Sequence, residues 1–354
     1  MRAIAIEGFG GRERLKLVDL PIPEPGPDDV LVRVRAAGVG PWDAKTREGL
    51  FGKRSFPHVL GFEASGIVEG AGENVADLRE GDEVYLYGGG SYAEYVVASA
   101  KKVARKPASL SFEEAAGVPV TASTAYQGIV EEIGLKERET GLIAGTAGGV
   151  GTMAVQTAAS LGARVLGTAS PRNHDYLRSL GADEAIDYRG DWVAAARTIV
   201  PRGVDAVFDC VGGETFRRSF EAVRDGGRVV TIVAFGEEVE PGRGITHHVF
   251  SARAERRKLE KLSEMFDTGE LRVEIDNMLP LEEAAKAHKR VEAGHTRGRI
   301  VLSVGCADER GKEQRMEYRE VRGCVANLAK EEHELYHRAG KGGLSAREHE
   351  RPRQ

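Results

Sequence analysis

The centre of the chain alternates between short apolar runs and longer amphipathic stretches, from residue 141 to residue 235. The apolar runs have the length and composition of buried strands, and the stretches between them place apolar residues at helical spacing. We expect strands at 141–144, 162–169, 181–188, 204–211 and 227–235, and helices at 152–161, 175–180, 192–199 and 215–223. Strands that alternate with helices in this way predict a parallel sheet with helices on both faces.

The first hundred residues have a different pattern, with short alternating or β-branched runs and no long amphipathic stretch. We expect strands at 1–6, 30–37, 64–69, 82–87 and 91–97. Glycine and proline stand between these runs, which is typical of tight turns and strand edges. The pattern predicts a barrel-like β domain ahead of the parallel sheet.

A glycine-rich turn joins the first strand of the parallel sheet to the helix that follows it. Gly149-x-Gly151-x-x-Ala154 matches the dinucleotide fingerprint, in which two glycines let the backbone approach a pyrophosphate and a small third residue lets the helix press on the strand. We therefore expect Ala147, Gly148, Gly149, Val150 and Gly151 to bind a dinucleotide. The alternative is a tight strand-to-helix turn without a ligand.

The turn after the second strand indicates which dinucleotide binds. NAD sites place a carboxylate about 20 residues beyond the glycines, where it holds the ribose hydroxyls. Here Ser170 stands 22 positions after Gly148, Arg172 follows it, and the turn has no carboxylate. A hydroxyl and a guanidinium suit the 2′-phosphate of NADP, so we expect NADPH as the cofactor. The alternative for Arg172 is a solvated residue at a helix start.

Several motifs then resemble one family. They are Gly61-Phe-Glu-Ala-Ser-Gly-Ile-Val68, Gly81-Asp-Glu-Val84, the segment 115–126, the glycine turn and Gly298-Arg-Ile-Val-Leu302. Residues 1–304 resemble the medium-chain dehydrogenase/reductase superfamily, in its zinc-free branch of quinone oxidoreductases and NADPH-dependent alkenal/one reductases. The resemblance implies an α/β fold, in which a GroES-like β-barrel catalytic domain precedes a doubly wound, Rossmann-type NADP-binding domain.

The resemblance and the strand pattern together predict the domain organisation. The catalytic domain is discontinuous and comprises residues 1–120 and 271–304, the NADP-binding domain comprises 121–270, and an amphipathic helix covers 253–267. Residues 305–354 form a charged extension, which we expect to be helical or disordered. In this extension a zinc site (Cys306, Cys324, His333, His337) and a small helical hairpin at 327–350 are further hypotheses, although the cysteine spacing is far from that of a zinc knuckle.

The chain departs from the zinc-dependent branch of the superfamily at the metal ligands. Gly40 stands near the place of the cysteine ligand, Phe62 takes the place of the histidine, and no cysteine precedes Cys210. An improvised site from Asp43, His58 and Glu63 is the alternative. We predict a site without metal.

The resemblance also implies where the nicotinamide and the acceptor bind. Zinc-free relatives carry Asn-Pro-x-Asp where this chain has Gly40-Pro-Trp-Asp43, so Gly40 offers backbone groups only and Trp42 is either a wall of the site or a core aromatic. Thr121 matches a threonine near the nicotinamide, or is a helix N-cap; Tyr188 matches a tyrosine at the 2′-phosphate end, or is a strand-end aromatic. Val211 and Phe235 follow strands at the edge where doubly wound sheets bind ligands.

Charge and composition exclude some partners. The formal net charge is −5 with both signs interspersed, and no apolar run approaches the ~20 residues that span a bilayer. We expect neither a nucleic-acid nor a membrane partner, and we expect a cytoplasmic homodimer. Its three cysteines are too scattered for a disulfide framework.

These observations predict an NADPH-dependent oxidoreductase that transfers hydride to a quinone or to an α,β-unsaturated carbonyl. No side chain is assigned as a dedicated catalytic acid, so backbone and hydroxyl donors must stabilise the reduced acceptor. The alternative function is an NADPH-binding redox sensor or scaffold with little turnover, which the replacement of asparagine by Gly40 favours.

Overall fold

The computed structural model describes residues 1–305 of the 354. The hypotheses of a zinc site and a helical hairpin, and all but the first residue of the predicted extension 305–354, lie outside the described residues. Met1–Gly305 form one structural unit, which contains the three sheets described below.

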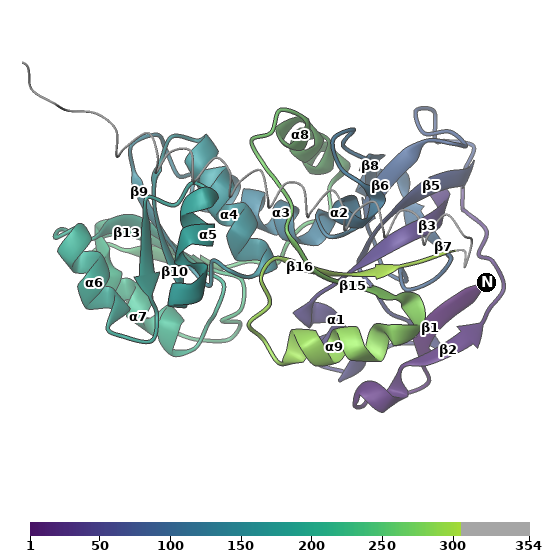
Figure 1. Ribbon diagram of the computed structural model, residues 1–354, viewed down its shortest axis with the longest axis horizontal. Helices are drawn as coiled ribbons and strands as arrows, with labels where there is room; N and C mark the ends of the chain where they lie inside the picture. Colours follow the sequence, from purple (N-terminus) through teal and green to yellow (C-terminus); the bar gives the residue numbers. More distant parts are fainter. Residues whose placement is uncertain (306–354) are drawn as a thin grey trace, which may run out of the picture. The chain divides into compact units, whose positions relative to one another are not determined.

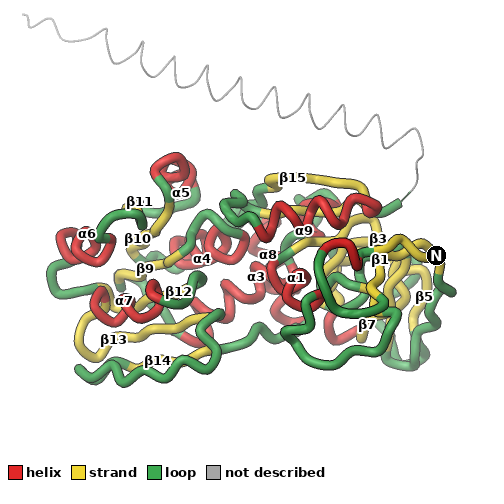
Figure 2. The backbone as a smooth tube through the Cα atoms, turned by 90° about the horizontal axis from the view of Figure 1, so that it is seen from below, coloured by secondary structure: helices red, strands yellow, loops and turns green. Residues whose placement is uncertain are grey.

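A six-stranded parallel sheet occupies the middle of the chain. Its spatial order is β11-β10-β9-β12-β13-β14, so the chain starts at β9, builds outward to one edge and then returns to build the other. The strands are β9 (Thr140–Ala144), β10 (Arg164–Ala169), β11 (Glu184–Asp187), β12 (Val204–Asp209), β13 (Val223–Thr231) and β14 (Thr246–Val249). This order confirms the doubly wound fold. Figure 2 shows the edge formed by β12, β13 and β14.

Helices cover both faces of this sheet because successive strand residues point to opposite sides. Ile143 packs with α4 and α8 in one core cluster, whereas its neighbour Leu142 packs with α6 and α7 in another (Figure 1). The helical segments are α3 (Pro119–Tyr126), the π-helix η3 (Gln127–Glu132), α4 (Gly149–Ser160), η4 (Pro171–Asn173), α5 (His174–Ser179), α6 (Trp192–Ile199), α7 (Glu214–Ala222) and α8 (Arg256–Asp267).

A seven-stranded sheet forms the first domain, as the resemblance implied. Its main path is β15-β16-β3-β5-β6-β8, and β7 also pairs with β3. The strands are β3 (Asp29–Val39), β5 (Glu63–Ala71), β6 (Glu83–Tyr87), β7 (Tyr95–Ser99), β8 (Val103–Arg105), β15 (Ile275–Pro280) and β16 (Arg299–Ser303). A second sheet has the order β2-β1-β4, formed by β2 (Lys16–Asp19), β1 (Arg2–Ile6) and β4 (His58–Val59).

Short helices complete the first domain. They are η1 (Arg12–Arg14), α1 (Pro41–Arg47), η2 (Ala100–Lys102), α2 (Phe112–Ala116), η5 (Leu281–Glu283) and α9 (Ala284–Glu292). The last strand, β16, pairs antiparallel with β3, so the end of the described chain lies beside a strand from near its beginning (Figure 1). The domain boundaries at 120 and 271 stay a prediction, because the described residues form a single unit.

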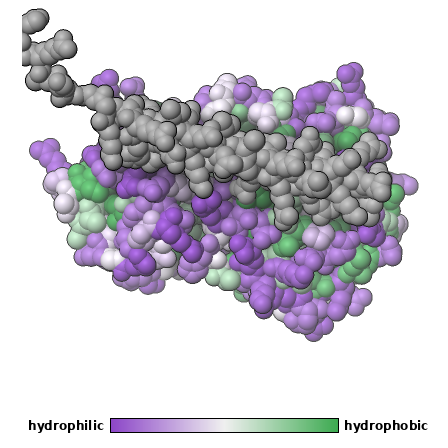
Figure 3. Space-filling view, in the orientation of Figure 1, coloured by the Kyte–Doolittle hydropathy of each residue, from purple (hydrophilic) through white to green (hydrophobic). Residues whose placement is uncertain are grey.

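On the part of the face in Figure 3 that is not drawn in grey, hydrophilic and hydrophobic side chains are interspersed. Among the described residues, no helix has both the length and the apolar composition needed to cross a membrane.

Candidate functional site

The glycine turn begins where β9 ends. Gly145 has a φ of 79°, which other residues rarely adopt, and a Cβ atom there would come within 2.9 Å of Val211 Cγ2. Gly148 is the extended N-cap of α4, and the helix begins at Gly149. The first backbone N–H groups of a helix have no partner within it, so those of Gly149, Val150 and Gly151 form a site suited to an anion.

Gly151 is also required for packing. A Cβ atom at this position would lie 2.3 Å from the carbonyl oxygen of Gly145, so only glycine lets α4 approach the turn so closely. Gly148 is different, because a Cβ atom there would meet only Gly145 O at 3.7 Å and Gly148 itself lines a cavity.

A cavity of about 460 Å³ opens at the turn. Gly145, Ser170, Tyr188 and Val211, which line it, follow the carboxyl ends of β9, β10, β11 and β12. The chain changes its direction of winding between β9 and β12, and this switch point is where doubly wound sheets bind ligands.

The opposite wall of the cavity comes from residues 291–300, which run from the end of α9 into β16. This segment contributes Val291, Gly294, His295, Thr296, Gly298, Arg299 and Ile300. The N–H of Gly298 donates to the carbonyl oxygen of Ala147 at 3.0 Å, which attaches the segment to the glycine turn. Sequence analysis missed this wall, because Gly298 gave only a family motif and no pattern relates it to a turn some 150 residues earlier.

Arg172 extends across the cavity toward this second wall. Its guanidinium donates to the carbonyl oxygen of His295 at 3.4 Å, and the backbone of His295 has a φ of 61°. The residues that line the cavity in the described part of the chain include no aspartate or glutamate. A phosphate group would therefore meet a guanidinium and hydroxyl groups, with no carboxylate to repel it.

The structure brings some of the expected cofactor residues together and leaves others apart. Those that line the cavity are Ala147, Gly148, Gly149, Ser170, Arg172, Tyr188 and Val211. Others do not line it: the side chain of Val150 packs on the core, Gly151 packs on the turn, and Phe235 is 60% exposed. Their assignment to the cofactor stays a prediction.

Thr121 lies within α3 and not at its N-cap. Its hydroxyl donates to the carbonyl oxygen of Gly117 at 2.9 Å, and its methyl group lies 3.0 Å from the position of a Cβ atom at Gly149. The methyl group of Thr121 therefore packs near Gly149, and its hydroxyl already donates a hydrogen bond within the protein.

The replacement of asparagine by Gly40 has a steric cause. A Cβ atom at Gly40 would lie 2.2 Å from Cζ2 of Trp42, so the indole occupies the space that a side chain at position 40 would need. The Trp42 ring in turn lies under the guanidinium of Arg299, with Cζ 5.4 Å from the ring centroid. Gly40 and Trp42 do not line the cavity themselves, whereas Val39, Pro41 and Arg299 do, so the assignment of Gly40 and Trp42 to the acceptor stays a prediction.

Arg299 is held by a buried cluster of charges. It pairs with Glu63, which is fully buried, and its Nε donates to the carbonyl oxygen of Gly117 at 2.7 Å. Asp43 is also fully buried and accepts from the N–H of Gly40 at 2.8 Å. Burial, together with the neighbouring Glu63 carboxyl, raises the pKa of Asp43 to about 8. The Arg299 guanidinium pairs with Glu63 and not with Asp43, so the buried Asp43 carboxyl favours the protonated form.

The improvised metal site receives no support within residues 1–305, where no three His, Cys, Asp or Glu side chains are grouped as metal ligands. Asp43 and Glu63 lie near each other, but their partners are the Gly40 N–H, the Val120 N–H and Arg299. Their arrangement supports the cavity wall rather than a cation.

This fold and this cavity define a two-domain dehydrogenase. Residues 26–108 match the alcohol dehydrogenase GroES-like domain, and residues 180–302 match the zinc-binding dehydrogenase domain. The chain belongs to the medium-chain dehydrogenase/reductase family, which confirms the resemblance seen in the sequence.

Three relatives illustrate the similarity. The chloroplastic quinone oxidoreductase QR1 of Triphysaria versicolor is 32% identical over 85% of this chain and 98% of that protein. The chloroplastic NADPH-dependent alkenal/one oxidoreductase of Arabidopsis thaliana is 33% identical over 85% of this chain and 79% of that protein. The Escherichia coli quinone oxidoreductase, solved in complex with NADPH, is 29% identical and superposes with a TM-score of 0.80, covering 86% of this chain and all of that one.

Proposed function

We propose that this protein is an NADPH-dependent reductase that transfers hydride to a quinone or to an α,β-unsaturated carbonyl without a metal ion. The observation that carries the proposal is the lining of the cavity at the end of β10, where Ser170 and Arg172 stand without any carboxylate among the described lining residues. The relatives support the same chemistry, since one of them is an NADPH-dependent alkenal/one oxidoreductase and another was solved with NADPH.

The residues present fit this cofactor. The first N–H groups of α4 would hold the pyrophosphate, and Gly148 leaves room for it because it has no side chain. Ser170, Arg172 and Tyr188 would hold the 2′-phosphate. When bound, NADPH supplies the hydride, and the chain's part is to orient it and to exclude water.

The chain's own residues support reduction without a metal ion. Neither Gly40 nor Phe62 can bind zinc where the zinc-dependent branch has ligands. Hydrogen-bond donors must therefore stabilise the charge that hydride transfer creates on the acceptor. A conjugated acceptor suits such a site, because its charge is delocalised as an enolate or a hydroquinone anion. The expected homodimer, the cytoplasmic location and the absence of nucleic-acid and membrane partners stay predictions.

Isotope transfer tests the proposed reaction. With NADPH deuterated at the 4-position and a short enone, we expect deuterium on the β-carbon of the saturated product and a solvent hydrogen on the α-carbon. The same result is expected from protein treated with EDTA and confirmed free of zinc by elemental analysis. Deuterium on the carbonyl carbon, or loss of activity together with one zinc ion per chain, would contradict the proposal.

A further inference from the structure

A second cavity, of about 470 Å³, shares no described lining residue with the first. Its lining combines two elements of the first domain with the segment between β14 and α8. The residues are Phe62, Tyr87, Gly88, Gly89, Lys102, Ala252, Arg253 and Ala254. Aromatic residues and glycines form half of this lining, and a side chain at Gly89 would meet nothing within 4 Å, so there is room for a flat ligand.

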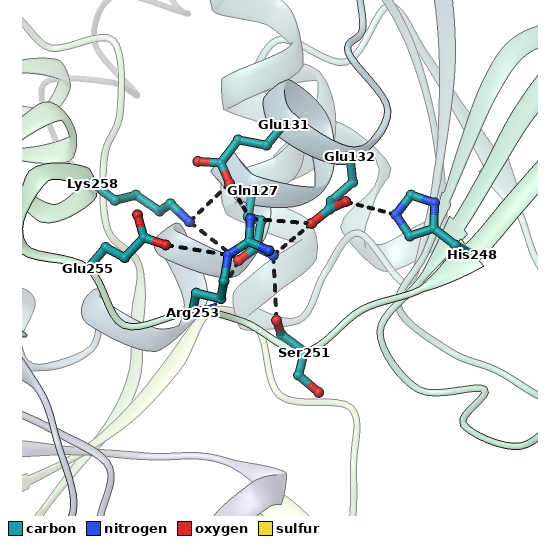
Figure 4. A network of polar contacts seen from close by, with 8 residues as sticks. All are labelled: Gln127, Glu131, Glu132, His248, Ser251, Arg253, Glu255 and Lys258. Atoms are coloured by element: carbon teal, nitrogen blue, oxygen red, sulfur yellow. Dashed lines mark hydrogen bonds and ion pairs between the residues drawn. The ribbon is translucent and has the colours of Figure 1, made fainter.

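The wall formed by residues 252–254 is fixed in place by a polar network. The backbone N–H of Arg253 donates to the buried Gln127 at 3.0 Å. Figure 4 shows the Arg253 guanidinium among carboxylates, with ion pairs to Glu131 at 3.2 Å, Glu132 at 3.7 Å and Glu255 at 3.4 Å. The charge of Arg253 is thereby neutralised, so this residue anchors the wall and leaves no positive charge for a ligand.

Tyr87 provides a hydrogen-bond donor in the cavity. Within residues 1–305 its hydroxyl has no hydrogen-bond partner, and the side chain is half-buried. Burial, with the nearby Glu63 and Asp43, raises the pKa of Tyr87 to about 12, so the phenol stays protonated at neutral pH. Tyr87 stands opposite Glu63 in the register of β5 and β6, and Glu63 pairs with Arg299 of the cofactor cavity. The donor therefore lies next to the residues that support the cofactor site.

Lys102 provides the unneutralised charge. Among the described residues, no carboxylate lies within ion-pair distance of its exposed ammonium group, and none lines this cavity. An ammonium group beside an apolar, aromatic wall favours an anion next to a flat ring. Its neighbour Lys101 is equally exposed but does not line the cavity, so the chain contains its own control.

We propose that this cavity binds the acceptor, and that the preferred acceptor is a planar conjugated carbonyl compound with an acidic substituent. Tyr87 donates to the carbonyl oxygen, where negative charge develops, and Lys102 binds the acidic group. Phe62 contacts the face of the acceptor's ring. This inference rests on the proposed reductase function and adds a substrate class to it.

Matched acceptors test the inference. We would compare 1,4-naphthoquinone with its 2-sulfonate in NADPH oxidation by the full chain, and measure binding of the sulfonate to the NADP⁺-loaded protein by calorimetry. A lower KM is expected for the sulfonate. Lys102→Met should raise that KM and the binding Kd by about tenfold, which corresponds to the loss of one charge-assisted hydrogen bond. The KM of the neutral quinone, which has no acidic group, should change much less. Lys102→Arg should retain the preference, and Lys101→Met should change nothing.

Tyr87→Phe tests the donor separately. We expect kcat/KM to fall by about tenfold or more for both quinones, while the Kd for NADPH stays unchanged, because the lost hydrogen bond serves only the acceptor. A weakened affinity for NADPH, or unchanged kinetics, would remove Tyr87 from the acceptor site.

The outcomes separate this inference from the proposed function. Equal KM values for the two quinones, or equal effects of Lys101→Met and Lys102→Met, would overturn the acidic substrate class while the reductase function stands. If the protein oxidises NADPH with neither quinone nor enone, the proposed reductase function fails. In that case, sulfonate binding that depends on Lys102 would still support the second cavity as a binding site for an acidic ligand. Absence of sulfonate binding would overturn that site as well.

Discussion

At the scale of single residues, the sequence indicated the cofactor contacts better than the acceptor side. Ser170 and Arg172 could be predicted because the distance from a glycine turn to the end of the next strand is short and nearly constant in this fold. His295 could not be predicted, because it reaches the cavity only through tertiary contacts; its carbonyl oxygen accepts a hydrogen bond from Arg172. Gly40 was noticed as a departure, but its cause is the Trp42 ring, which only the structure reveals.

Arg172→Ala should weaken NADPH binding by roughly 10- to 100-fold, because a charge-assisted hydrogen bond contributes about 1.5–3 kcal/mol. NADH should bind as before, since it has no 2′-phosphate. Fluorescence titration of both cofactors checks this. Arg178→Ala is the matched control, because Arg178 lies on the adjacent helix α5, pairs with Asp175 and does not line the cavity. Parallel losses for NADPH and NADH would place Arg172 outside the phosphate site.

Asp43 should make stability depend on pH. Its pKa rises from 3.8 to about 8 on folding, mainly through burial, so the folded protein holds a proton that the unfolded chain releases. The contribution of this proton to the free energy of unfolding is therefore fully present below about pH 4 and is lost as pH rises toward about 8. Asp43→Asn cannot ionise, so its Tm relative to the wild type should increase across this window. Parallel Tm curves from pH 4 to pH 9 would contradict the assignment.

At the scale of elements, the order β9, glycine turn, α4 could be predicted because each part has a local cause: an apolar run, a backbone with positive φ and a helix of small residues. The strand β14 was missed, since its sequence, Thr246-His-His-Val249, is short and has little apolar character at the edge of the sheet. The π-helix η3 has no sequence pattern of its own, and Gln127 within it anchors the wall of the second cavity.

Alanine substitutions at two glycines of the turn should affect different properties of the protein. Gly151→Ala forces a Cβ atom against Gly145 O, so we expect a loss of about 1–3 kcal/mol in the free energy of unfolding. Gly148→Ala adds a methyl group to the cavity with no close contact in the protein, so NADPH affinity should fall while stability changes little. Urea unfolding and cofactor titration of both variants check this. Equal losses of stability would mean that both glycines serve packing.

At the scale of the whole molecule, local patterns predicted two sheets but not how the cavity is closed. The parallel sheet supplies one wall, and the other comes from residues 291–300, which run from α9 into β16. The bond from Gly298 to Ala147 joins positions far apart in the chain, and no periodicity encodes such a contact. The family resemblance gave the return of the chain to the first sheet, because β16 carries the motif at Gly298–Leu302.

A chain that ends at Gly305 should fold and bind NADPH as the full chain does. Residues up to 305 form the three sheets, the core clusters and the two cavities that the structure describes. We expect Tm to change by less than about 2 °C, the scale of a substitution outside the core, with an unchanged Kd for NADPH. A chain that ends at Arg297 is the control: it lacks β16, whose Ile300, Val301 and Leu302 are buried, and should not fold. A large loss of Tm in the chain that ends at Gly305 would show that residues 306–354 stabilise the protein. A loss of NADPH affinity alone in that chain would mean that residues 306–354 contribute to the cofactor site.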